Sequence, residues 1–186
     1  VVRNIEKRVS TGEFHYKDCA ILYRTNAQSR MFEEKLLMAS IPYRIIGGVN
    51  FYARKEIKDL LAYLKTVDNA RDDLAVRRII NVPKRGIGAT TLTRVQEYAG
   101  EHGISFYEAL KGASGIPSLG RSYMKVEPFV NFIQVLKSKA EHVSVKELLE
   151  EIIEETGYMR ELRAEATDEA LTRLENIDVL ISKVAA

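Results

Sequence analysis

The spacing of apolar residues changes near Gly48, and this change constrains the fold more than any other feature of the sequence. Before it, two short apolar runs, residues 17–24 (KDCAILYR) and 43–46 (YRII), flank a segment with helical spacing that ends before Pro42. After it, apolar residues recur three and four positions apart, as is typical of amphipathic helices. The sequence therefore predicts a strand, a helix and a second strand, followed by an all-helical part.

These patterns place a domain boundary near residues 49–56. Residues 1–52 are predicted to be an incomplete α/β piece, because two strands and one helix cannot cover both faces of a sheet. The strands that complete the sheet would have to come from elsewhere in a longer chain or from a partner. Residues 53–186 are predicted to form a mostly α-helical domain.

The second part carries recognisable helix ends. Ser105 with Glu108 has the spacing of a capping box, in which the side chains satisfy amides that the first turn leaves unpaired. Ser144 with Glu147 repeats that spacing, and Gly157 is a predicted C-cap. The apolar stripes of the predicted helices are Ile57, Leu60, Leu61, Leu64 and Val67; Leu74, Val76, Ile79 and Ile80; Val126, Phe129, Val130, Ile133, Leu136 and Ala140; and Leu171, Leu174, Ile177, Ile181 and Val184.

Charge is distributed unevenly, although the net charge is only +2. Residues 1–125 carry 21 basic and 13 acidic side chains, whereas residues 126–186 carry 7 basic and 13 acidic ones. No acidic residue lies between Asp73 and Glu97, and the cations in that interval are Arg77, Arg78, Lys84, Arg85 and Arg94. The interval predicts either a solvated helix face or a surface that binds a polyanion, and composition alone does not separate the two.

The most specific local pattern is residues 81–94, NVPKRGIGATTLTR. Gly86 and Gly88 flank Ile87, which is predicted to anchor a turn in the core. Glycines in such a turn let backbone amides approach a phosphate, and Thr90 is predicted to cap a helix whose N-terminus favours an anion. The cations that would add positive charge are Lys84, Arg85 and Arg94. The pattern resembles the hairpin of helix-hairpin-helix DNA-binding modules, although glycine pairs before helices also occur in turns that bind nothing.

A second candidate surface is residues 23–30 (YRTNAQSR), at the carboxyl end of the first predicted strand. Open α/β sheets place ligands at this edge, where polar side chains and free amides converge. Two interpretations remain open from the residues alone. Either Asn26 only caps the following helix and Arg24 is a surface charge, or both contribute to a ligand site.

Residues that could carry catalysis or hold a metal are scarce. The sequence contains no GxxxxGK[ST] phosphate loop, and its three histidines are too scattered for a metal site. Cys19 is a poor candidate for a nucleophile in the middle of a predicted strand. Asp168 and Glu169 follow a polar run where a nucleotide-site acid pair requires an apolar strand. The acidic cluster Glu150, Glu151, Glu154 and Glu155 indicates a solvated helix face rather than a metal site.

The sequence also predicts a soluble, cytoplasmic protein without membrane contact. No window approaches the roughly 18 consecutive apolar residues that a membrane span needs. The first residues lack the basic, apolar and small-residue order of a signal peptide.

Four runs resemble the UvrD/Rep/PcrA family of superfamily 1 DNA helicases: ILYRTNAQSRMFEEKLL, IPYRIIGGVNFYARKEIKD, NVPKRGIGATTL and TRLENID. The resemblance implies that residues 1–52 open the second RecA-like P-loop NTPase motor domain, called 2A. It implies that residues 53–186 are most of its helical accessory subdomain, called 2B. It also implies an ATP-dependent helicase that moves 3′ to 5′ along single-stranded DNA, with ATP and Mg²⁺ bound mainly by residues outside this chain.

The resemblance also assigns roles to residues by position. Arg24 and Asn26 match family residues that contact single-stranded DNA, which favours the ligand-site interpretation of residues 23–30. The residues that match the contact of 2B with the duplex backbone are Lys84, Gly86, Ile87, Gly88 and Thr91. The implied role of this chain is therefore to grip DNA, and alone it is expected to be inactive as an ATPase.

The expected partners are single-stranded DNA, duplex DNA and the remaining segments of the same helicase. One alternative is a helix-hairpin-helix DNA-binding module with no enzyme attached. Another is a protein-interaction or autoinhibitory scaffold whose working surface is the acidic residues 126–186. Salt-dependent DNA affinity separates the two DNA-binding hypotheses from the scaffold.

Overall fold

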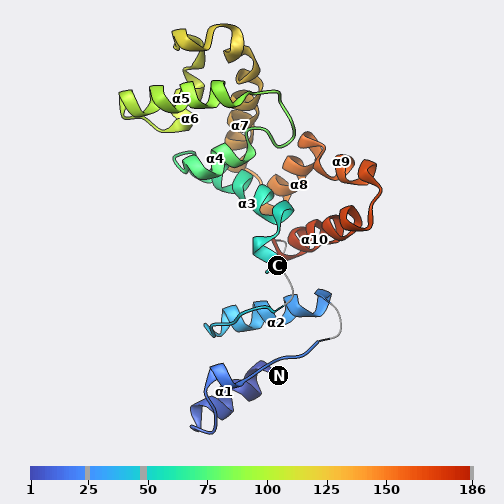
Figure 1. Cartoon of the computed structure of the whole chain (residues 1–186). Helices are drawn as coiled ribbons and strands as arrows, with labels where there is room; N and C mark the ends of the chain where they lie inside the picture. Colours follow the sequence, from blue (N-terminus) through green and yellow to red (C-terminus); the bar gives the residue numbers. More distant parts are fainter. Residues whose placement is uncertain (24–25, 47–49, 185–186) are drawn as a thin grey trace. The chain divides into compact units, whose positions relative to one another are not determined.

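The computed structural model describes residues 1–23, 26–46 and 50–184, and the chain divides into two compact units, Val1–Arg54 and Lys55–Ala186 (Figure 1). In the first unit, α1 (Val2–Ser10) and α2 (Asn26–Met38) are the α-helices. Two 3₁₀ turns accompany them, η1 (Tyr16–Asp18) and η2 (Phe51–Ala53).

The predicted α/β fold is wrong, because no strand lies in residues 1–23, 26–46 or 50–184. A β-strand exists through hydrogen bonds to a neighbouring strand, and the apolar runs at residues 19–23 and 41–46 form no such ladder with each other. Only part of these runs packs on the helices. Val2 of α1, Leu36 of α2 and Ile41 form a small core, against which Ile21 and Tyr43 pack. Leu22 and Ile46 are 95% and 74% exposed, so the apolar content of the runs indicated neither a sheet nor full burial among the described residues.

The second unit consists of helices and the turns between them in its described residues. Its α-helices are α3 (Lys55–Asp68), α4 (Asp73–Ile79), α5 (Ala89–His102), α6 (Phe106–Lys111), α7 (Glu127–Ala140), α8 (Val145–Thr156), α9 (Tyr158–Glu165) and α10 (Asp168–Val184). Two 3₁₀ segments, η3 (Ala113–Gly115) and η4 (Pro117–Lys125), connect α6 to α7. The predicted apolar stripes fall on α3, α4, α7 and α10.

Helix α3 lies at the centre of this unit and packs against α4, α7, α8 and α10 (Figure 1). Ile57, Leu60 and Tyr63 of α3 are completely buried, which accounts for the long apolar stripe that the sequence carries there. Because α3 contacts helices on several sides, it fixes α4 and hence the connection that leads from α4 to α5.

Buried polar contacts fix how the helices around α3 pack. The Asp59 carboxylate is 2% exposed, lies 2.8 Å from Nε of Arg78 on α4, and accepts a 2.8 Å hydrogen bond from the Tyr158 hydroxyl on α9. Burial, together with the charge of Asp59, raises the pKa of Tyr158, so this hydroxyl remains a donor. Asn176 of α10 donates to buried Glu56 at 2.8 Å. These contacts join α3 to α4, α9 and α10.

Several predicted helix ends are confirmed. Ser144 and Glu147 form a complete capping box at α8, and the hydrogen bonds from Ser144 lower the pKa of Glu147. The predicted capping box at Ser105 is only half formed: Ser105 accepts from the Glu108 amide at 3.2 Å at the start of α6, but the Glu108 side chain pairs with Lys111. Gly157 ends α8 with φ +66°, a left-handed conformation that favours glycine.

Candidate nucleic-acid interface

The connection between α4 and α5 is a closed hairpin held by Asn81. The Asn81 side chain donates to the carbonyl of Ile87 at 2.7 Å and accepts from the amide of Ile87 at 3.2 Å. Ile87 is 4% exposed, so the predicted anchoring of the turn in the core is confirmed. No role was predicted for Asn81, although asparagine at the start of a turn is a common signal of such side-chain-to-backbone bonds.

The two glycines of the hairpin differ in what they require. Gly86 has φ +68°, a conformation that strains any residue with a side chain. Gly88 has φ −72° and ψ 157°, which any residue adopts, and a Cβ placed there meets no atom within 4 Å. Both glycines are exposed. Gly86 is therefore needed to form the turn, whereas Gly88 leaves open space above the backbone.

Helix α5 starts without a side-chain cap. Gly88 occupies the N-cap position. From Gly88 onward, the first amide that donates a hydrogen bond is that of Leu92, which bonds the carbonyl of Gly88 at 3.2 Å. Thr90 lies inside the helix, so its predicted capping role is wrong. The amides without a partner among the described residues are those of Gly88, Ala89, Thr90 and Thr91. In contrast, Asp72 and Ser144 cap α4 and α8. Helices α7 and α9 also start without a side-chain cap. Free amides at a helix N-terminus favour an anion, and those of α5 lie at an exposed turn.

Arg85 points into the protein and does not add charge to the surface, contrary to the prediction. Its Nη1 donates to the carbonyls of Ile79 and Ile80 at 3.0 and 3.1 Å, which closes the C-terminus of α4. Its Nη2 donates to the Tyr63 hydroxyl at 2.8 Å, and the guanidinium lies 5.1 Å from the centre of the Phe129 ring. Arg85 therefore holds the hairpin on the core.

Three other cations of the acid-free interval are exposed residues that each contact another group of the protein. Arg78 pairs with Asp59, and Arg77 donates to Gln96 at 2.9 Å. Arg94 donates to the carbonyl of Ser118 at 2.5 Å. Lys84 is exposed and forms no hydrogen bond or ion pair with any residue that the structure describes. Lys84 is therefore the cation of the hairpin itself that has no partner among the described residues, while exposed Arg77 and Arg94 keep their charge because their acceptors are neutral.

The hairpin thus brings together most of the residues predicted to contact a duplex. Lys84, Gly86 and Gly88 are exposed along the turn, and the free amide of half-buried Thr91 lies in the first turn of α5. Ile87 is buried and acts from beneath as the anchor. The arrangement presents backbone amides and one ammonium group, which suit phosphate oxygens and carry no means of reading bases.

The predicted single-strand contact lies largely outside the described residues. Arg24 is not among them, and Asn26 is described only as the first residue of α2. Beyond it, buried Ser29 donates to Glu33 at 3.1 Å, and Arg30 lies 5.4 Å from the centre of the Phe51 ring. The later part of the run thus contributes to the packing of the first unit.

The described residues do not fit ATP with Mg²⁺. The sequence lacks a phosphate loop with a Gly-Lys pair. No three His, Cys, Asp or Glu side chains in the described part of the chain gather as metal ligands would.

In the same part of the chain, no helix is long and apolar enough to cross a bilayer.

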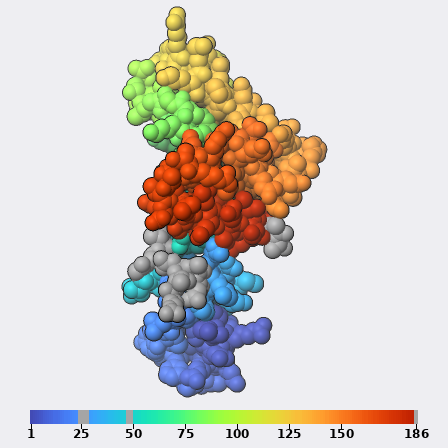
Figure 2. Space-filling view, turned by 90° about the vertical axis from the view of Figure 1, so that its right-hand side faces the viewer, coloured from blue at the N-terminus to red at the C-terminus, as the bar shows by residue number. Residues whose placement is uncertain are grey.

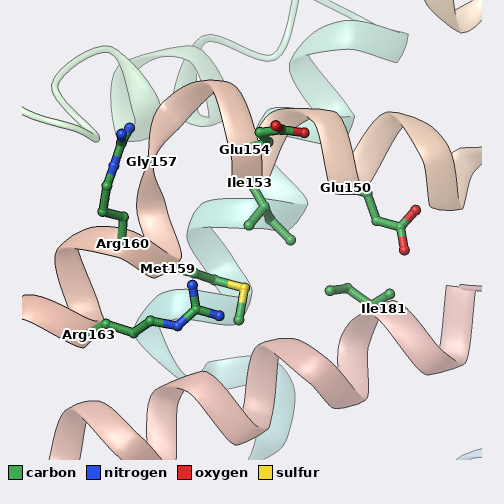
Figure 3. A pocket seen from close by; sticks show the side chains of 8 residues that line it. All are labelled: Glu150, Ile153, Glu154, Gly157, Met159, Arg160, Arg163 and Ile181. Atoms are coloured by element: carbon green, nitrogen blue, oxygen red, sulfur yellow. The ribbon is translucent and has the colours of Figure 1, made fainter.

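A cavity of about 380 Å³ lies among α8, α9 and α10 and differs in character from the hairpin (Figure 3). Ile153, Met159 and Ile181 form its apolar part. Its charged lining residues are Glu150, Glu154, Arg160 and Arg163. Because carboxylates and guanidinium groups line it together, the cavity has no preference for a polyanion.

The chain is similar to known helicases over nearly its whole length. The family described as UvrD-like helicase C-terminal domain matches residues 1–183. A protein of Bacillus subtilis (strain 168), "ATP-dependent DNA helicase PcrA", is 46% identical over 182 residues, which are 98% of this chain and 25% of that protein. Proteins with the same name from Staphylococcus aureus (strain Mu50) and Staphylococcus epidermidis are 43% and 42% identical over the same shares. The chain spans about a quarter of the length of these relatives.

Proposed function

This chain belongs to the UvrD-like helicase C-terminal domain family, and from that premise we propose that it grips DNA within an ATP-dependent DNA helicase. The relatives reported above are named ATP-dependent DNA helicases, and the chain matches a quarter of their length. The catalytic ATP site is assigned to residues outside this chain, since the described residues offer neither a phosphate loop nor a cluster of metal ligands. The proposed contribution of this chain is contact with nucleic acid.

The uncapped N-terminus of α5 beside Lys84 is the observation that carries this proposal. Its free amides and the partial positive charge of the helix end favour a phosphate group, and the exposed glycines let a duplex backbone approach closely. Lys84 adds a full charge without an internal partner. Since phosphates are the same in every duplex, this grip is independent of sequence.

The finer assignments follow the same family. Residues 1–52 belong to the second motor domain and residues 53–186 to the accessory subdomain. Arg24 and Asn26 contact the single strand on which the motor moves 3′ to 5′, while the hairpin holds the duplex ahead of the fork. ATP and Mg²⁺ are bound by other parts of the intact enzyme. Bacterial DNA lies in the cytoplasm, and the named relatives are bacterial, so we place the activity there.

Gly88→Ala tests the backbone contact with little disturbance of the fold. The substitution fits the φ and ψ of this position and meets no atom within 4 Å. The free energy of unfolding should change by less than about 1 kcal/mol, because alanine is a poorer N-cap residue than glycine but reduces the entropy of the unfolded chain. The added methyl group stands where the phosphate would approach. We expect the affinity for duplex DNA to fall about tenfold, the equivalent of one hydrogen bond to a charged group. Fluorescence anisotropy with two unrelated duplexes measures the loss, which should be equal for both.

Gly100→Ala is the matched control. Gly100 is also exposed, lies on α5, and has open space for a Cβ, but it is near the other end of the helix. Its substitution should leave duplex affinity unchanged. Equal affinities of wild type, Gly88→Ala and Gly100→Ala would contradict the backbone contact. A chain that binds no duplex at any salt concentration would favour the scaffold hypothesis.

A further inference from the structure

Backbone amides along the hairpin alternate between bonded and free. The amides of Arg85 and Ile87 donate to Oδ1 of Asn81 at 3.4 and 3.2 Å. Those of Gly86 and Gly88 have no partner among the residues that the structure describes, and both glycines are exposed. The side chain of Asn81 therefore takes up every second amide of this stretch and leaves the others available to a ligand.

The backbone on both sides of Asn81 is held on the core. Asn81 follows Ile79 and Ile80 at the end of α4, and both isoleucines are buried. The amide of Val82 donates to the carbonyl of Ile79 at 2.9 Å, and the carbonyl of Val82 accepts from the Tyr63 hydroxyl. The Asn81 side chain therefore extends toward the hairpin from a fixed point.

Both polar groups of the Asn81 side chain are used within the protein. An asparagine side chain accepts at its oxygen and donates at its nitrogen. Here Oδ1 accepts from the two amides, and Nδ2 donates to the carbonyl of Ile87 at 2.7 Å. Asn81 is half-buried and carries no charge. It can therefore affect a phosphate only through the backbone that it holds.

The free amides lie where a ligand can reach them. The green region of Figure 2, which includes α5, is at the surface of the second unit. A Cβ built on Gly86 or on Gly88 would meet no atom within 4 Å, so the space above both residues is open. A ligand that needs two donors binds more tightly when both are held in place beforehand, because less backbone freedom is lost on binding.

We propose that Asn81 is a positioning residue of the duplex contact, which holds the amides of Arg85 and Ile87 inward and thereby presents those of Gly86 and Gly88 to phosphate oxygens. This inference rests on the proposed function. Because Asn81 is neutral, it contributes through the geometry of the donors and not through the number of counterions released from DNA. Its effect on binding therefore differs in kind from that of a lysine.

Duplex binding by Asn81→Ala, measured over a range of salt concentrations, tests this role. We expect the affinity to fall about tenfold at every salt concentration, the scale of the entropy lost when the backbone of one residue is fixed. The slope of log K against log salt should remain that of wild type, since Lys84 keeps its charge. The matched control is Asn176→Ala, which removes another asparagine of the same unit, one that donates to Glu56 at 2.8 Å. This control should keep the wild-type affinity.

A double-mutant cycle with Gly88→Ala separates positioning from general stability. Asn81 acts through the amides that Gly88→Ala obstructs, so the double variant should lose less affinity than the product of the two single losses. Amide hydrogen exchange at Arg85 and Ile87 should be faster in Asn81→Ala and unchanged in Asn176→Ala. Thermal unfolding gives a temperature at which each variant is folded. If Asn81→Ala does not fold, Asn81→Ser replaces it with the same expected loss, because its hydroxyl is too short to reach both the amide and the carbonyl of Ile87.

The outcomes separate this inference from the proposed function. Wild-type affinity in Asn81→Ala, with weakened binding in Gly88→Ala, would overturn the role of Asn81 and leave the hairpin contact intact. Equal losses in Asn81→Ala and Asn176→Ala would also overturn it, because they would report stability and not the hairpin. Single losses that multiply in the cycle would overturn it too, since the two residues would then act independently. Absence of duplex binding in the wild type would overturn both the inference and the proposed function.

Discussion

Arg78→Met is expected to lower the free energy of unfolding of the second unit by about 1.5–3 kcal/mol, because it removes a charged hydrogen bond to the buried carboxylate of Asp59, while the arginine itself is 35% exposed. Methionine keeps the aliphatic stem of arginine, so the loss would reflect the missing charge and hydrogen bonds. Arg78 also donates to the carbonyl of Lys55 at 3.3 Å, a contact that joins α4 to the first turn of α3. Urea denaturation followed by circular dichroism measures the effect.

An exposed ion pair provides the control for this prediction. Lys146 and Glu150 lie 3.6 Å apart on the surface of α8, with side chains 42% and 47% exposed. Lys146→Met should change the free energy of unfolding by no more than about 0.5 kcal/mol, since water screens such pairs. Similar small losses in Arg78→Met and Lys146→Met would mean that Arg78 is a surface cation, and the account of α3 packing would be incorrect.

Arg85→Lys is expected to destabilise the hairpin by about 3 kcal/mol although the charge is retained. The guanidinium bonds the carbonyls of Ile79 and Ile80 and the hydroxyl of Tyr63 at the same time, and an ammonium group cannot match that planar arrangement. Burial raises the pKa of Tyr63, so this hydroxyl stays neutral beside the arginine. Because the turn at residues 84–88 rests on these bonds, duplex affinity should fall with stability.

The opposite exchange at the neighbouring position separates charge from structure. Lys84 is exposed and has no internal partner, so Lys84→Arg should keep both the free energy of unfolding and the affinity for duplex DNA. If Arg85→Lys also left the free energy of unfolding and the duplex affinity unchanged, the positive charge of Arg85 would matter rather than its hydrogen bonds. Its inward position would then be unimportant for the hairpin.

Lys84 and Arg85 show which features of the site could be predicted from the sequence and which could not. The hairpin could be predicted because its signals are local: two glycines, a buried isoleucine between them and a helix that follows. The family resemblance drawn from four runs is confirmed by the match over residues 1–183. The direction of each cation could not be predicted, because Arg85 bonds Tyr63, 22 residues earlier, and Arg78 pairs with an aspartate on another helix.

The fold was predicted unequally for a similar reason. Amphipathic helices such as α3 and α7 can be predicted from the spacing of their own apolar residues. The caps at Ser144 and Gly157 can be predicted from the residue types at the ends of α8. A strand depends on a partner elsewhere, and the apolar runs near Ile21 and Ile41 instead pack on α1 and α2. Helix α1 was missed, although Val2, Ile5 and Val9 have helical spacing. The polar link from Asp59 to Tyr158 spans 99 residues and leaves no local signal.

The salt dependence of duplex binding by wild type and Lys84→Gln is the most direct measurement of the central claim, that the hairpin binds the phosphate backbone. Lys84 is an exposed cation four residues before the N-cap of α5, and its loss is expected to remove one phosphate contact. The slope of log K against log salt should become smaller by about 0.9, with equal losses of affinity for two unrelated duplexes. An unchanged slope, or a loss confined to one duplex sequence, would contradict the account.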